Sequence, residues 1–116
     1  MLLVCRFQPL ANDVAGVGAA ADAFAARAQR ALALLTAAPG CLGGELGRAV
    51  DEPTEWVLTV RFASVDAYRR ALSPFEVREH VVPLLSEARP EPSTFETLAS
   101  AVDGHVSVQP SLLSDG

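Results

Sequence analysis

The chain has no lysine, and all nine basic residues among its 116 are arginine. Acidic residues number fourteen and give a formal charge of −5, which argues against nucleic acid or an anionic membrane surface as a partner. No apolar run is long enough to span a membrane, and no basic segment precedes the apolar start, so we expect neither a transmembrane segment nor a signal peptide. These absences favour a cytoplasmic protein.

Cysteine and histidine are also scarce. The two cysteines, Cys5 and Cys41, fit a reducing compartment better than a disulfide scaffold. The two histidines, His80 and His105, lie far apart and have no cysteine at metal-ligand spacing. The sequence therefore predicts no metal site.

Hydrophobic residues make up 50% of the chain, which favours a single folded domain with a modest core. Apolar residues alternate in some segments and recur every three or four residues in others, patterns that predict strands and helices. We expect strands at 2–7, 41–50, 55–62 and 93 to about 101, a loop at 10–18, and helices at about 19–37, 64–72 and from 74 to a bend or end near 83. The order β-α-β-β-α-β places one domain at 1–102 and a polar tail at 103–116, which would add to a partner's sheet edge or remain disordered.

Local signals set the ends of the helices. Pro39 and Gly40 stop the first helix, because Pro lacks an N–H donor and Gly accepts the left-handed conformation of a helix end. Ser64 caps the second helix, and Asp66 places a negative charge in its first turn. We expect Val65, Tyr68 and Leu72 of this helix to face inward. The segment 73–76, SPFE, has the pattern of a capping box with Pro at the first helical position, so we expect a new helix to begin there.

The strand at 55–62 is largely apolar on both faces. Its even-numbered residues from Trp56 to Phe62 are all apolar, and the other face carries Val57, Thr59 and Arg61. Helices of a chain this short cover one face of a sheet, so the second face needs another cover. The simplest cover is a second copy of the chain, and we expect a homodimer.

Four segments resemble the antibiotic biosynthesis monooxygenase family. They are VCRF (4–7), APGCLGG (38–44), LTVRFASVDAYRRAL (58–72) and EHVVPL (79–84), and the similarity covers roughly residues 1–101 in the same element order. The resemblance implies a ferredoxin-like α+β fold with a four-stranded antiparallel sheet, in a dimer whose two sheets close into an α+β barrel. It also implies a monooxygenase without metal, flavin or other cofactor, acting with molecular oxygen on a small aromatic, quinol or polyketide-type substrate.

Members of that family often use an Asn on the first strand, a Trp at the end of the third strand and a His in the second helical region. By resemblance these positions hold Cys5, Phe62 and His80, so only the histidine is kept. The Cys5 thiol is a weak donor that cannot replace a carboxamide, and Phe62 keeps an aromatic wall without an indole N–H.

His80 is the candidate catalytic residue. The family's chemistry needs a base that removes a phenolic or anthrone proton, which leaves an electron-rich anion able to react directly with oxygen. Histidine side chains suit that step at neutral pH. The alternative is a half-buried helix histidine hydrogen-bonded to the backbone or to a carboxylate such as Glu76.

Five further residues are candidates for binding a flat aromatic substrate: Cys5, Phe7, Trp56, Phe62 and Tyr68. The aromatic side chains among them are otherwise plain core, and Cys5 is otherwise a small buried apolar side chain. Tyr68 and Phe75, near the expected helix break, are candidates for the mouth of the cavity.

Two other functions stay open. A non-catalytic dimeric domain would keep the ligand cavity without the chemistry, and the departures at Cys5 and Phe62 favour it. Haem degradation ranks last, because two of the three expected positions differ.

Overall fold

The computed structural model describes residues 1–9 and 17–113, so most of the loop expected at 10–18 lies outside the described residues. The elements in order are β1 (Leu2–Phe7), α1 (Val17–Thr36), β2 (Cys41–Arg48), β3 (Trp56–Phe62), α2 (Val65–Ala71), α3 (Phe75–His80), α4 (Val82–Leu85), β4 (Thr94–Phe95), β5 (Ala99–Val102) and β6 (His105–Val108). Four strands form one antiparallel sheet in the order β2-β3-β1-β4. This is the ferredoxin-like α+β arrangement that the sequence predicted.

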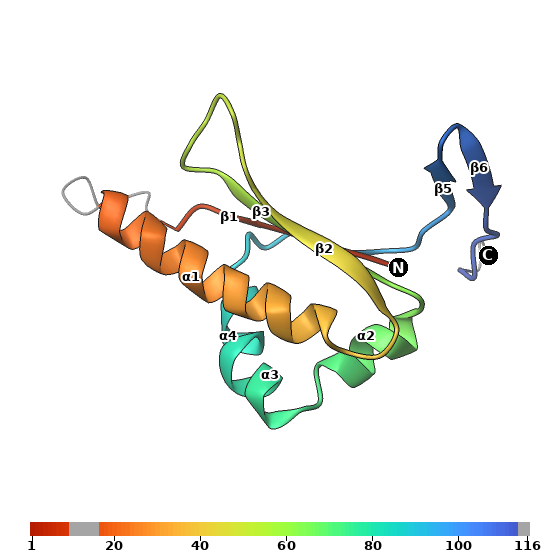
Figure 1. Ribbon diagram of the computed structural model, residues 1–116, viewed down its shortest axis with the longest axis horizontal. Helices are drawn as coiled ribbons and strands as arrows, with labels where there is room; N and C mark the ends of the chain where they lie inside the picture. The colour runs from red at the N-terminus through yellow and green to blue at the C-terminus, as the bar shows by residue number, and fades with distance from the viewer. Residues whose placement is uncertain (10–16, 114–116) are drawn as a thin grey trace.

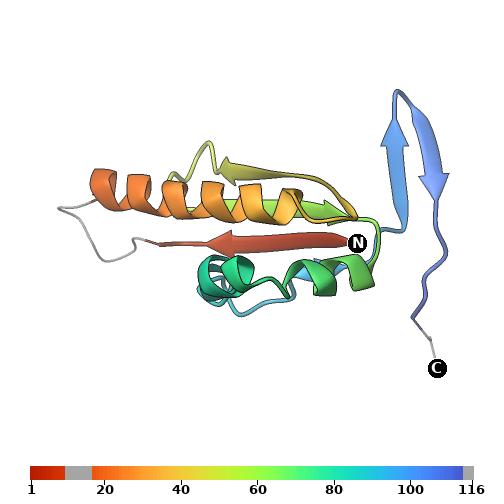
Figure 2. The same cartoon turned by 60° about the horizontal axis from the view of Figure 1, so that its bottom comes forward.

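The helices lie on one face of this sheet, as Figures 1 and 2 show. Helix α1 meets the sheet through a face that includes Ala28 and Ala31, both fully buried, between Phe24 and Leu35. Side chains as small as Ala allow the helix and the sheet to approach closely. Among the described residues, no helix is long and apolar enough to cross a membrane.

The strand register places the predicted residues on the helix-facing side of the sheet. Cys5 lies opposite Leu58, and Phe7 lies opposite Trp56. Alternate residues share a face of a strand, so Phe62 falls on the same side. All of these side chains are buried except that of Trp56, which is half-buried at the end of the sheet.

Gly40 joins the end of α1 to the sheet in the left-handed region, at a φ of 85°. Its carbonyl accepts a hydrogen bond of 2.8 Å from the backbone N–H of Ala63, and Ala67 on α2 packs directly against it. Ser64 caps α2 as predicted, with its side-chain oxygen 3.0 Å from the backbone nitrogen of Ala67. The helix turns Ala67 and Ala71 inward, whereas Val65, which we expected to face inward, is 44% exposed.

The predicted capping box at 73–76 is wrong in its register. Pro74 is the N-cap of α3 with an extended ψ of 148°, and the helix begins at Phe75. Ser73 therefore stands one position too early to cap it, and no side chain does so. The chain bends between α3 and α4 next to Pro83, as expected, because Pro cannot donate the hydrogen bond that would continue the helix.

The last strand is also shorter than predicted. Only Thr94 and Phe95 pair with β1, where 93 to about 101 was expected to form a strand. Residues from Ala99 onward leave the sheet and pair with 105–108 as a separate hairpin. The predicted division of the chain at residue 102 thus falls at the tip of this hairpin.

Replacing Gly40 with Ala should destabilise the fold. The new Cβ would lie 2.7 Å from the Cβ of Ala67, at a backbone conformation that side chains rarely adopt, so we expect a loss of about 2 kcal/mol in the free energy of unfolding. Gly18→Ala is the matched control, since nothing lies within 4 Å of its added Cβ in α1 and helix propensity favours Ala by about 0.5–1 kcal/mol. Urea unfolding followed by circular dichroism measures both. Equal stability of the two variants would contradict the packing described for Gly40.

Candidate functional site

The residues predicted to bind substrate do not surround one cavity. Cys5, Phe7 and Phe62 are closed in the interior, each no more than 2% exposed. Trp56 and Tyr68 are half-buried and border different hollows of the surface. The structure therefore presents these residues mainly as core.

Ring contacts divide the aromatic residues into two groups. Phe24 of α1 lies 5.1 Å from the ring of Phe7 and 5.4 Å from that of Trp56, whereas Phe62 packs 5.4 Å from Tyr68. Trp56 and Phe62 are the two ends of β3. At about 3.3 Å per residue, six steps along a strand separate the two groups by roughly 20 Å. One small flat ligand cannot touch both.

The polar groups beside the second aromatic group are neutral. Burial raises the pKa of the Cys5 thiol to about 11, an effect partly opposed by a hydrogen bond with Ser93. Burial, followed by the nearby Cys5, also raises the pKa of Tyr68. Near neutral pH both side chains are hydrogen-bond donors, so neither is suited to act as a nucleophile or base.

An apolar cleft of about 610 Å³ opens instead between the end of α1 and the junction of α2 with α3. We call it the helical cleft. Its apolar walls come from Leu34, Pro39, Ala71 and Val77, and Phe75, 69% exposed, stands at its edge. Its volume lies within the range of about 300–1,000 Å³ that is usual for small-molecule sites.

Two charged residues, Arg70 and Glu76, complete the lining of the helical cleft. Arg70 has no carboxylate partner among the described residues, whereas its neighbour Arg69 lies 3.7 Å from Asp66. An apolar cleft with one unpaired guanidinium suits a ring that carries an anionic or strongly polarised oxygen.

His80 lies one helical turn beyond the helical cleft. Glu76, in the lining, and His80 are four residues apart on α3, so both side chains lie on the same face of the helix. The His80 side chain is 34% exposed, and its Nε2 is 3.9 Å from Oε2 of Glu79. The carboxylate nearest to the imidazole is thus Glu79, where the sequence suggested Glu76.

Arg70 and Phe75 form part of the helical cleft, but neither was predicted as a binding residue from the strand alignment. Phe75 was expected only at the mouth of a cavity between the sheet and the helices. The available signal was the helix break at 72–74, which in the structure turns the two short helices apart and exposes the end of α1. A pattern of helix breaks shows that a gap exists, but it does not show which side chains line it.

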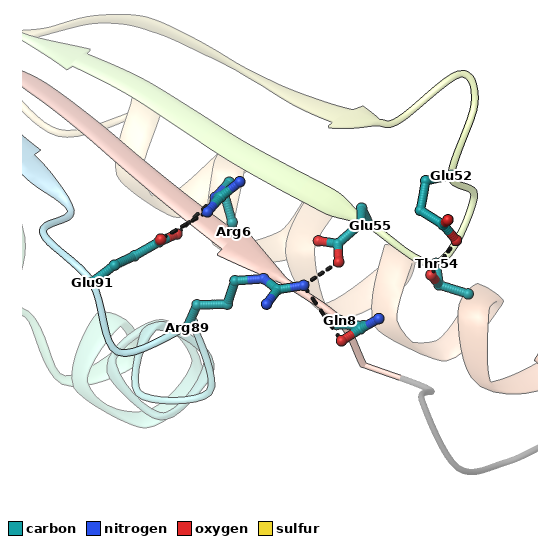
Figure 3. A network of polar contacts seen from close by, with 7 residues as sticks. All are labelled: Arg6, Gln8, Glu52, Thr54, Glu55, Arg89 and Glu91. Carbon is teal, nitrogen blue, oxygen red and sulfur yellow. Dashed lines mark hydrogen bonds and ion pairs between the residues drawn. The ribbon is translucent and has the colours of Figure 1, made fainter.

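The sheet face opposite the helices carries ion pairs, drawn in Figure 3. Arg6 donates two hydrogen bonds of 2.7 and 2.8 Å to Glu91, and these lower the pKa of that carboxyl. Arg89 donates to Glu55 and to Gln8. Glu91 and Glu55 are therefore paired with arginines within the chain.

No group of three or more His, Cys, Asp or Glu side chains that could hold a metal ion occurs within 1–9 and 17–113.

Solved structures resemble this fold over most of its length. SnoaB, a cofactor-independent oxygenase from Streptomyces nogalater, is 23% identical, with a TM-score of 0.60 over 84% of this chain and 94% of that one. Rv0793 from Mycobacterium tuberculosis is 19% identical, with a TM-score of 0.59 over 99% and 97%. A conserved protein from Methanosarcina mazei Go1 is 13% identical, with a TM-score of 0.60 over 80% and 84%. At these identities the likeness establishes the fold.

No curated protein matches the sequence. The family model described as antibiotic biosynthesis monooxygenase matches residues 17–81, more than half of the chain. The matched region runs from the start of α1 through α3 and contains the helical cleft and His80. The chain belongs to the antibiotic biosynthesis monooxygenase family.

Proposed function

We propose that this protein is a cofactor-independent monooxygenase that acts with molecular oxygen on a small aromatic, quinol or polyketide-type substrate. The observation that carries the proposal is the helical cleft, an apolar cavity that ends one helical turn from His80. Family membership supports the reaction class, and SnoaB, which shares the fold, is itself described as a cofactor-independent oxygenase.

The proposed chemistry starts with proton removal by His80. An imidazole takes a proton from a phenolic hydroxyl or from the CH₂ group of an anthrone, and the resulting anion is rich enough in electrons to react with oxygen. For an anthrone, the hydroperoxide that forms loses water, so the CH₂ group becomes a C=O group. One oxygen atom of O₂ becomes the carbonyl oxygen, and the other leaves as water with the two hydrogens of the CH₂ group. The substrate supplies all the electrons.

Arg70 is placed to hold the substrate's anion. A guanidinium at the edge of an apolar cavity attracts an oxyanion more strongly than it does in open water, because the surroundings screen the charges less. Phe75 offers a flat ring beside it for an aromatic substrate. In this proposal Arg70 of α2 binds the substrate and His80 of α3 takes its proton, and the two helices meet at the helical cleft.

The five residues predicted to bind substrate take a supporting part in this proposal. Phe62 packs against Tyr68, which fixes α2 on the sheet and so sets the position of Arg70. Cys5 and Phe7 fill the core between the sheet and the helices, and Trp56 packs against Phe24 at the far end of that core. Each is a positioning residue and none needs to touch the reacting atoms.

We also propose that the protein works as a cytoplasmic homodimer. Among the described residues no helix covers the sheet face opposite α1, and its partly buried residues Val4 and Val57 favour further cover. Arg6 and Glu91 on that face offer both signs of charge, which a two-fold symmetric interface can match.

A non-catalytic ligand-binding domain is the second candidate. The filled interior around Cys5 and Phe62, where the family often places Asn and Trp, favours it. It predicts that a ligand binds in the helical cleft without oxygen uptake.

His80→Ala should lower the turnover of an active anthrone or hydroquinone by about 10²–10⁴-fold, the usual contribution of a general base. Arg78→Ala is the matched control, since it removes an exposed basic side chain from the same helix. Oxygen uptake is measured with chelator-treated protein against a no-enzyme control, because such substrates autoxidise. Equal rates for His80→Ala and the wild type would remove His80 from the mechanism.

Arg70→Ala should raise the KM for a phenolic substrate about tenfold, the effect of losing roughly one charge-assisted hydrogen bond. Arg69→Ala, one residue earlier and outside the lining of the helical cleft, should leave KM unchanged. Steady-state kinetics across substrate concentrations separates KM from kcat. A larger effect from Arg69 than from Arg70 would place the substrate elsewhere.

Cys5 should resist alkylation in the folded protein. A thiol with a pKa of about 11 is about one part in a thousand thiolate at pH 8, and Cys5 is 2% exposed, whereas Cys41 is partly exposed. Iodoacetamide at pH 8 followed by peptide mass spectrometry should label Cys41 first, and both cysteines in urea. Rapid labelling of Cys5 in the native protein would mean that the interior opens to solvent.

A further inference from the structure

A second cavity, of about 500 Å³, lies at one end of the sheet, away from the helical cleft. Three arginines line it, Arg6, Arg48 and Arg89, and we call it the arginine hollow. Its lining also includes Val57 of β3 and Gly47 of β2, which lie opposite each other in the sheet. The proposed oxidation uses none of these five residues.

Gly47 keeps the floor of the arginine hollow open. Gly47, Val57 and Arg6 form one row across three strands, so all three belong to the sheet face away from the helices. A Cβ at Gly47 would lie 3.2 Å from Cγ1 of Val57, so a side chain there would occupy the hollow. Gly47 is not among the glycines with a positive φ, so its backbone conformation does not require glycine. What this glycine provides is space beside the apolar surface of Val57.

The guanidinium of Arg89 has donors that the chain does not use. It lies near Arg6 over the sheet, as Figure 3 shows. Its Nη2 donates to Glu55 and Gln8, but its Nε is buried and has no hydrogen-bond partner among the described residues. Buried polar atoms in folded proteins are nearly always hydrogen-bonded. This Nε therefore indicates an acceptor that comes from outside the chain.

Positive charge is in excess at the arginine hollow. Arg48, unlike the other two arginines, has no carboxylate partner within 1–9 and 17–113. Its guanidinium lies 4.7 Å from the centre of the Trp56 ring, which belongs to a residue of the same lining. The charge of Arg48 thus stays uncompensated locally, although the whole chain carries a formal charge of −5. A hollow with this balance of charge attracts anions.

We infer that the arginine hollow binds a small flat carboxylate, such as an aromatic acid. The carboxylate accepts charge-assisted hydrogen bonds from Arg89 and from Nη1 of Arg6, because Arg6 uses only its Nε and Nη2 for Glu91. The flat body lies on Val57, in the space beside Gly47. A cavity of this volume is within the usual range of about 300–1,000 Å³ for small molecules.

This site is independent of the proposals made above. It shares no lining residue with the helical cleft, so its ligand is not the substrate bound there. It also lies beside the turn at 49–55, at the end of the sheet, and so takes up only the margin of the face that a second copy would cover.

Trp56 reports on this site directly. It is the single tryptophan of the chain, and it lines the arginine hollow but not the helical cleft. Titration with benzoate should change its fluorescence to saturation, whereas benzamide, which has a similar shape and no charge, should leave it unchanged. Inorganic phosphate should bind at least about tenfold more weakly than benzoate, because it has no apolar surface to place on Val57. An equal response to benzamide, or phosphate binding as tight as that of benzoate, would overturn the assignment of a flat carboxylate.

Two variants test the lining. Arg89→Met removes the guanidinium and keeps an apolar stem, so the Kd for benzoate should rise at least about tenfold. Its matched control is Arg61→Met, which removes an arginine from the same face of β3 outside the hollow and should leave the Kd unchanged. Gly47→Val fills the hollow without changing any charge and should abolish binding, since Val suits a strand. Circular dichroism verifies that each variant folds.

Three results would contradict the inference. The first is wild-type fluorescence that benzoate does not change, and the second is Gly47→Val protein that binds benzoate as tightly as the wild type. The third is a benzoate response that survives in Arg89→Met but is lost in Arg70→Met, which would place benzoate in the helical cleft.

Discussion

The close contact between α1 and the sheet is the constraint on which the rest of this structure depends. Ala28 and Ala31 are fully buried there, so the helix backbone approaches the strands and leaves no gap beneath it. Phe24 and Leu35 fill the space at either side. The helical cleft opens beyond this contact, where the helix ends.

The end of α1 is also the part of the fold that sequence signals located best. Pro39 and Gly40 stop the helix by backbone chemistry that does not depend on the rest of the chain, and Ser64 caps α2 by an equally local bond. These connections were predictable because a few neighbouring atoms determine them. The strands followed from alternation, which depends only on one face being buried.

Features that depend on distant atoms were less predictable. Whether Ser73 caps a helix depends on where α3 begins, and Pro74, in an extended conformation, moves that start by one residue. Val65 was expected to face inward as a large apolar residue, but packing against Gly40 turned the smaller Ala67 inward. The hairpin of β5 and β6 had a local signal, Asp-Gly between two alternating segments, but 93–101 was predicted as one strand.

The same distinction applies to the candidate site: the position of a residue along the chain was predictable, but its burial in the fold was not. Family resemblance locates His80 on the second helical region, because it compares positions along the chain. It cannot report that Cys5 and Phe62 end in a filled interior, since their burial depends on how tightly α1 packs. Nor does it point to Arg70, which lines the helical cleft only because the helices diverge after Ala71.

The buried interior is a poor place for proton transfer, because its polar side chains stay neutral. Proton transfer needs a group that changes charge near neutral pH, and the buried thiol of Cys5 and phenol of Tyr68 both have raised pKa values that keep them neutral. An anion formed beside them would lack a countercharge, and a charge buried without a partner costs free energy. Arg70 lines the helical cleft and has no carboxylate partner among the described residues, and the partly exposed imidazole of His80 lies one helical turn beyond the cleft. Charge separation costs less near the surface, so the proton transfer that we propose is more favourable at the surface of this chain than in its core.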